Sequence, residues 1–171
     1  MTNHLNDEQL EHLVPYSFKR SAHKLPRVRQ RGPRLPGAVL QHGIPARRGE
    51  IFNLVFESAK SDWEQSVTLV TDNTVKLGNK LYKKGVIVNY DPSRVPLRIA
   101  VGTIEGMLWV WNSWQYRDAS GILHTMSQLN YAGMMVEKLS NGFRYRCNEG
   151  KDDDDYDDLV FRIEATGTFE G

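Results

Sequence analysis

The sequence predicts a mainly β protein: an antiparallel β-sandwich or barrel of jelly-roll-like type, preceded by a short helix and an extended basic arm. Two observations carry this prediction. From Ile51 onward, short apolar or alternating runs follow one another with turn residues between them. Before them, residues 16 to 49 are rich in proline, glycine and arginine, a composition that favours neither helix nor sheet. We therefore divide the chain into 1–15, 16–49 and 50–171.

The N-terminal segment, residues 1–15, is expected to contain a short helix from Asn6 to Val14. Asn6 is a suitable N-cap, acidic residues follow it, and Pro15 ends the segment. So short a helix is not stable alone in water, so it must dock on another surface.

The arm, residues 16–49, concentrates positive charge. The chain as a whole has a formal net charge of +1, yet residues 16 to 48 contain nine Lys or Arg and no Asp or Glu. Arginine matches phosphate oxygens geometrically, and Tyr16 and Phe18 are able to stack on bases. We therefore expect nucleic-acid binding without sequence specificity through this arm. The nine residues are Lys19, Arg20, Lys24, Arg27, Arg29, Arg31, Arg34, Arg47 and Arg48.

The β domain, residues 50–171, is expected to hold nine strands. Asn141 and Gly142 predict a hairpin turn with positive φ between two of them. The stretch from Gly121 to Leu139 also allows a helix, because its apolar residues recur at helical spacing. The expected strands are 51–56, 66–71, 85–90, 97–101, 107–116, 122–131, 134–139, 143–147 and 159–169.

The run LWVWNSWQY, residues 108–116, is the most aromatic part of the chain. On a strand, Trp109 and Trp111 share one face, whereas Leu108, Val110 and Trp114 share the other. One interpretation is a core strand. The other is an interface with Trp109, Trp111 and Trp114 as anchors, facing a second subunit, bases or sugar.

The run KDDDDYDD, residues 151–158, holds six carboxylates, which cannot all be buried. We expect a solvent-exposed loop. Asp153, Asp155, Asp157 and Glu164 match four EF-hand positions, but Asp158 stands where that loop requires glycine, so an EF-hand is not expected. A solvated charge run without metal is the main interpretation, and a looser Ca²⁺ site is the lesser alternative. A further interpretation is that the 152–158 loop of one subunit meets the basic arm of its neighbour.

Enzymatic motifs are missing from the sequence. There is no glycine-rich phosphate loop, HExxH or G-x-S-x-G. Cys147 is the single cysteine, which excludes an intramolecular disulfide and a cysteine-based zinc site, and His124 is the only histidine in the body. We expect a non-enzymatic protein without a cofactor.

A basic, proline-rich arm followed by a compact β domain resembles the layout of small single-jelly-roll viral coat proteins. The resemblance rests on the arm from Tyr16 to Arg48 and on the short strands from Ile51 onward. It implies a self-assembling virion protein, made in the host cytoplasm, whose arm faces the packaged genome while the β domain builds the shell. Phage tail and head-completion proteins, whose extended arms lace neighbouring subunits, have the same layout.

Two alternatives stay open. One is a monomeric β-barrel that binds single-stranded nucleic acid through its aromatic face. The other is a lectin-like or membrane-surface β protein that uses the Trp cluster. Neither crosses a membrane, because no apolar run approaches the roughly 20 residues that a span requires.

Overall fold

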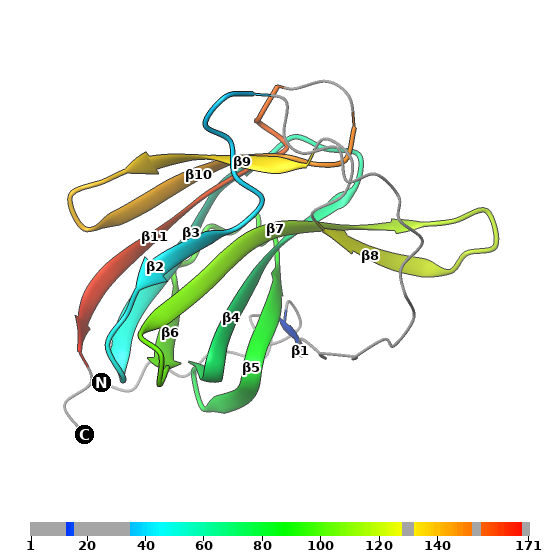
Figure 1. The fold of residues 1–171 in the computed structure, drawn as a ribbon. Coiled ribbons are helices and arrows are strands. Elements are labelled where there is room, and N and C mark those ends of the chain that lie inside the picture. The colour runs from blue at the N-terminus through cyan, green and yellow to red at the C-terminus, as the bar shows by residue number, and fades with distance from the viewer. Residues whose placement is uncertain (1–12, 16–34, 128–131, 152–154, 169–171) are drawn as a thin grey trace.

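The computed structural model describes residues 13–15, 35–127, 132–151 and 155–168, and every regular element within them is a β-strand. The strands pair antiparallel throughout and form one curled sheet, a half-barrel that wraps around its own core (Figure 1). The expected mainly β, antiparallel class is therefore confirmed.

Eleven strands make up the sheet. The last nine of them coincide with the nine runs expected from the sequence, with ends that differ by a few residues. They are β1 (Leu13–Pro15), β2 (His42–Pro45), β3 (Glu50–Ala59), β4 (Glu64–Leu77), β5 (Lys80–Asn89), β6 (Leu97–Gly102), β7 (Met107–Arg117), β8 (Leu123–Ser127), β9 (Gly133–Lys138), β10 (Gly142–Asn148) and β11 (Leu159–Thr168).

The sheet curls because β4 belongs to both of its halves. The strand order is β1-β5-β4-β6-β3-β11-β10-β9, while β7 pairs with the first half of β4 and carries β2 and β8 on its other edge. Residues 64–70 of β4 pair with β7, and residues 74–77 pair with β6. Between them the register with β5 shifts, and the Thr71 hydroxyl donates to the carbonyl of Thr74 (3.1 Å). An irregularity of this kind bends a strand, which here redirects β4 from one wall to the other.

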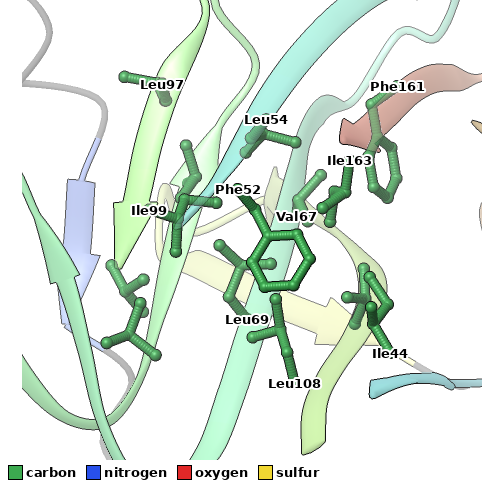
Figure 2. Close-up of a cluster of buried hydrophobic side chains, with 14 of the residues drawn as sticks. Ile44, Phe52, Leu54, Val67, Leu69, Leu97, Ile99, Leu108, Phe161 and Ile163 are labelled. Atoms are coloured by element: carbon green, nitrogen blue, oxygen red, sulfur yellow. The ribbon is translucent and has the colours of Figure 1, made fainter. Parts of the chain in front are cut away.

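The concave side of the sheet holds the core. Alternation along each strand places every second side chain there, so Val67 and Leu69 of β4 meet Leu108 and Val110 of β7 without solvent exposure. Figure 2 shows the side chains of six strands converging on this centre. The labelled residues are Ile44, Phe52, Leu54, Val67, Leu69, Leu97, Ile99, Leu108, Phe161 and Ile163.

The prediction of a helix from Asn6 to Val14 is wrong for the two of its residues that the structure describes, 13 and 14. Leu13–Pro15 form β1, which runs antiparallel to residues 86–88 of β5. A free strand edge offers unpaired N–H and C=O groups, so a short segment gains backbone hydrogen bonds there that an isolated turn of helix does not hold in water. The remainder of the expected helix lies outside the described residues.

The last part of the expected arm, residues 35–49, belongs to the folded domain. Strand β2 pairs with residues 107–110 of β7, and Ile44 is 4% exposed within the core. Val39 exchanges two backbone hydrogen bonds with Met134 of β9 (2.9 and 2.8 Å). Residues 42–45 are thus paired into the sheet ahead of the boundary expected at residue 50. Four residues beside a proline give too little periodicity to mark β2 in the sequence.

The expected β9–β10 hairpin is confirmed, but its turn works differently. Neither Asn141 nor Gly142 has a positive φ. A Cβ on Gly142 would instead overlap the carbonyl oxygen of Ile163 on β11. Glycine is needed here because the neighbouring backbone approaches closely. The helical alternative for the stretch from Gly121 to Leu139 is wrong over β8 and β9, and residues 128–131 lie outside the described part.

Candidate functional site

The predicted nucleic-acid-binding cations are only partly described. Arg47 and Arg48 lie just before β3 and are exposed. The Arg47 N–H donates to the carboxylate of Glu50 (2.7 Å), which fixes the turn into β3. The other seven predicted residues lie outside the described part of the chain: Lys19, Arg20, Lys24, Arg27, Arg29, Arg31 and Arg34.

The three predicted interface tryptophans do not share one surface. Trp114 is 2% exposed and Trp111 is 8% exposed, so both are used inside the protein. Trp109 is 36% exposed, opposite Gly43 of β2, and its ring occupies the space that a side chain at Gly43 would fill. Of the three, Trp109 alone remains available as a contact to another molecule.

Trp114 belongs to an aromatic stack that the sequence did not suggest. Its ring lies parallel to that of Trp63, with 6.4 Å between centroids, and Tyr116 stacks on His124 at 5.2 Å. The Lys151 ammonium lies 4.5 Å from the centroid of Trp63. Since these rings contact one another, the stack supports the base of the β7–β8 hairpin.

The tip of that hairpin is held by Asp118. Its carboxylate accepts hydrogen bonds from the backbone N–H groups of Ser120 (2.9 Å) and Ile122 (3.0 Å) and contacts His124 Nε2 (2.8 Å). The hydrogen bond with His124 and those backbone bonds lower the pKa of the Asp118 carboxyl. His124 is therefore engaged in a turn, and Ile122 is left 58% exposed at the tip.

The acidic loop is anchored by buried carboxylates. Glu149 is 1% exposed and accepts a hydrogen bond from Gln65 Nε2 (2.9 Å), while its N–H donates to Asp158 Oδ2 (2.9 Å). Asp158 is thus buried, which corrects the expectation of a uniformly solvated loop, and residues 152–154 lie outside the described part. Burial also raises the pKa of the neighbouring Cys147 thiol, aided by the charge of Asp158.

Of the calcium ligands considered from the sequence, Asp155 and Asp157 lie together, Glu164 lies apart from them, and Asp153 is outside the described residues. The carboxylates of Asp155, Asp157 and Asp158 lie within 4.8 Å of one another. Glu164, however, accepts a hydrogen bond from Arg162 (2.8 Å) in the middle of β11. Asp157 faces Lys60 at 3.6 Å, so part of the acidic charge is neutralised within the loop's own surroundings.

On the convex side of the sheet, charges are paired over β3, β9, β10 and β11. Glu57 accepts hydrogen bonds from Arg144 Nε (3.1 Å) and Arg162 Nη1 (2.9 Å). Arg144 also reaches Glu137 (3.2 Å). These cations are neutralised by carboxylates on the same face, so they contribute little to long-range attraction.

Further along the same convex side, over β4, β5 and β6, the cations lack such partners. We call this surface the cationic face; it consists of Arg48, Lys76, Lys83 and Arg98. All four are exposed, and none forms an ion pair with another residue in the described ranges. Their inward neighbours Val75, Tyr82 and Ile99 are buried, which fixes the direction of the charged side chains.

A shallow hollow of about 200 Å³ lies within the cationic face. Its rim carries Arg48 and Lys76, and Leu81, which is 60% exposed, supplies an apolar wall. Small residues keep the floor open, and none of the described residues that line the hollow is acidic. The lining is Arg48, Gly49, Thr74, Lys76, Leu81, Ala100, Val101 and Gly102.

Lys76, Lys83 and Arg98 were not among the residues predicted from the sequence, because the arm has the denser positive charge. The signal was present: residues 76–98 contain six Lys or Arg and a single acid, Asp91, for a net charge of +5. The rest of the stretch 49–171 contains seven basic and 17 acidic residues. A count over the whole domain hides this division.

Comparison with known proteins does not assign the chain to a family. No protein-family model matches the sequence, and no curated protein or solved structure shows significant similarity to it. In the described ranges, no helix has the length and apolar character of a membrane span.

Proposed function

We propose that the chain is a non-enzymatic, self-assembling structural protein of a virus particle, of coat or of tail and connector type. In this proposal the curled sheet is a jelly-roll-like shell or connector domain. The arm from Tyr16 to Arg48 binds packaged nucleic acid or laces neighbouring subunits.

The observation that carries the proposal is the division of charge between an acid-free arm and an acidic domain. Nine cations without a single carboxylate in residues 16–48 form a strong attractor for a polyanion. A curled antiparallel sheet with free strand edges, joined to that arm, suits repeated packing of identical subunits.

Light scattering combined with absorbance at 260 and 280 nm, at low and at high salt, tests this proposal. A coat-type protein forms a large assembly that carries nucleic acid and releases it as salt rises. A large assembly free of nucleic acid indicates arm-to-subunit lacing. A monomer at both salt concentrations refutes self-assembly, and if it still binds oligonucleotides it favours the β-barrel nucleic-acid-binding alternative.

Replacing four arm residues, Arg27, Arg29, Arg31 and Arg34, by alanine tests the arm itself. Each phosphate contact on a single strand contributes a slope of about 0.7 to the dependence of log affinity on log salt. Loss of four contacts therefore reduces the slope by roughly 3, equally for every sequence. Unchanged binding contradicts the role given to the arm.

A further inference from the structure

We propose that the cationic face is a second nucleic-acid-binding surface, on the folded domain, where the sugar–phosphate backbone of a single strand continues from the arm into the hollow. This inference rests on the proposed function, because it takes the arm's ligand to be nucleic acid. It differs from it in assigning phosphate contacts to Lys76, Lys83 and Arg98.

Continuity with the arm is the first support. Arg48 is the last cation of the arm and also lines the hollow. A strand held by the arm is thereby delivered to the hollow at high effective concentration, so even weak contacts on the domain add to the total affinity.

The spacing of the charges is the second support. Lys76 pairs across strands with Ala100, and Arg98 lies two residues before Ala100 on the same face of β6. Two residues along a strand and one strand across place the Cα atoms of Lys76 and Arg98 on the order of 8 Å apart. That distance is about one Debye length at physiological salt, so the potentials of the cations reinforce one another.

The composition of the hollow is the third support. A nucleotide presents a charged phosphate beside a less polar sugar and base. The hollow offers the complementary arrangement, since two cations at the rim stand beside the apolar surface of Leu81, Ala100 and Gly102. The hydroxyl-bearing Thr74 lines the same space. Contacts of this kind recognise the backbone and not the sequence.

The acidic loop of a second copy is the competing occupant, and the contacts of two of its carboxylates, Asp157 and Asp158, disfavour it. Asp158 is buried and accepts the N–H of Glu149, and Asp157 faces Lys60 within the same subunit. These carboxylates are already satisfied, so moving them into another subunit's hollow breaks existing interactions. The phosphates of a nucleic acid carry no such cost.

The first experiment compares full-length variants by fluorescence anisotropy with a labelled oligothymidylate of about 20 nucleotides across a salt series. The face variant is Lys76→Gln, Lys83→Gln and Arg98→Gln. A control of equal charge change takes exposed cations from elsewhere in the domain: Arg117→Gln, Lys138→Gln and Arg146→Gln. The arm variant described above completes the set, and thermal melting shows whether each variant is folded.

Loss of three phosphate contacts reduces the salt slope by about 2 and the affinity at 0.1 M monovalent salt on the order of 100-fold. We expect this for the face variant, and parental behaviour for the control. A face variant with the parental slope, beside an arm variant with a reduced one, overturns this inference and leaves the proposed function intact. Equal losses in face and control variants also overturn it, since they report net charge alone. A parent protein that does not bind the oligonucleotide overturns this inference together with the nucleic-acid role of the arm, and leaves only the arm-to-subunit form of the proposed function.

A second experiment locates the strand directly. Cys147 is the chain's one cysteine and is buried, so Leu81→Cys supplies a single accessible thiol for a benzophenone photo-crosslinker. Ile122→Cys is the matched control, because Ile122 is 58% exposed and Leu81 60%, on a different surface of the domain. We expect crosslinked oligonucleotide from position 81 and little from position 122. Crosslinked protein dimers from position 81, with no oligonucleotide captured, overturn the inference in favour of a second copy.

Discussion

Replacing Glu57 by glutamine tests how the convex side of β3, β10 and β11 is stabilised. The Glu57 carboxylate receives hydrogen bonds from Arg144 Nε and Arg162 Nη1 at 3.1 and 2.9 Å. Arg144 and Arg162 are direct cross-strand partners. Without the carboxylate two like charges face one another, a destabilising arrangement on adjacent strands.

The expected loss follows from the exposure of these groups. Hydrogen bonds to charged groups contribute about 1.5–3 kcal/mol each when shielded. The three side chains are 24–31% exposed, so we reduce this to about 1 kcal/mol for each arginine contact. The opposed arginines add about 0.2–1 kcal/mol. Glu57→Gln therefore lowers the free energy of unfolding by about 2–3 kcal/mol, which for a chain of this size lowers Tm by roughly 4–12 °C.

Urea unfolding followed by tryptophan fluorescence measures this change in the free energy of unfolding. Glu64→Gln is the control, because Glu64 is exposed and forms no ion pair with a described residue. The double variant Glu57→Gln, Arg144→Gln is the sharper measurement. Removing one of the two opposed cations relieves the repulsion, so we expect the double variant to be more stable than Glu57→Gln alone. A double variant that is less stable, or a single variant within about 0.5 kcal/mol of the parent, refutes the reasoning.

Two further predictions concern the backbone and the protonation state of the core. Gly142→Ala forces a Cβ against the carbonyl of Ile163, so we expect a loss of about 1–3 kcal/mol in urea unfolding, and an unchanged midpoint refutes the close approach. Burial lowers the pKa of His42 from its ordinary 6.5, and His42 Nδ1 hydrogen-bonds the buried Tyr145 hydroxyl (2.9 Å). The unfolded chain therefore binds this proton more readily, so stability falls as pH drops below about 6.5. His42→Gln removes that part of the decline, and an identical pH dependence in parent and variant contradicts it.

The elements of the half-barrel were readable from the sequence wherever a strand carries its own periodicity. Strand β10 alternates buried Tyr145 and Cys147 with Arg144 and Arg146, and β7 places Leu108 and Val110 in the core, which was one of the two interpretations of that run. These patterns are local, so they can be recognised in the sequence without knowledge of the partner strands. Strands β1 and β2 do not show in the sequence, because their pairing with β5 and β7 is decided by free edges elsewhere in the sheet.

The site was less readable than the fold, because its chemistry depends on which charges meet across strands. Arg144 and Arg162 look like free cations in sequence, yet Glu57, far away along the chain, forms an ion pair with each of them. Lys76 and Lys83 resemble ordinary strand residues, and pairing places them together on one exposed surface. Trp114 shows the opposite case, since a residue that looked like an interface anchor is stacked on Trp63.

The positive and negative charges of the domain are concentrated in different parts of it. Residues 76–98 carry a net charge of +5, while the remainder of 49–171 carries −10. The β4–β5 turn lies at the bottom of the view in Figure 1, and the described residues of the loop that joins β10 to β11 lie at the top. Under the proposed function, a polyanion is attracted to residues 76–98 and repelled by the acidic remainder of the domain, so nucleic acid at the arm would orient the subunit. This follows from charge placement alone and does not require recognition of any base.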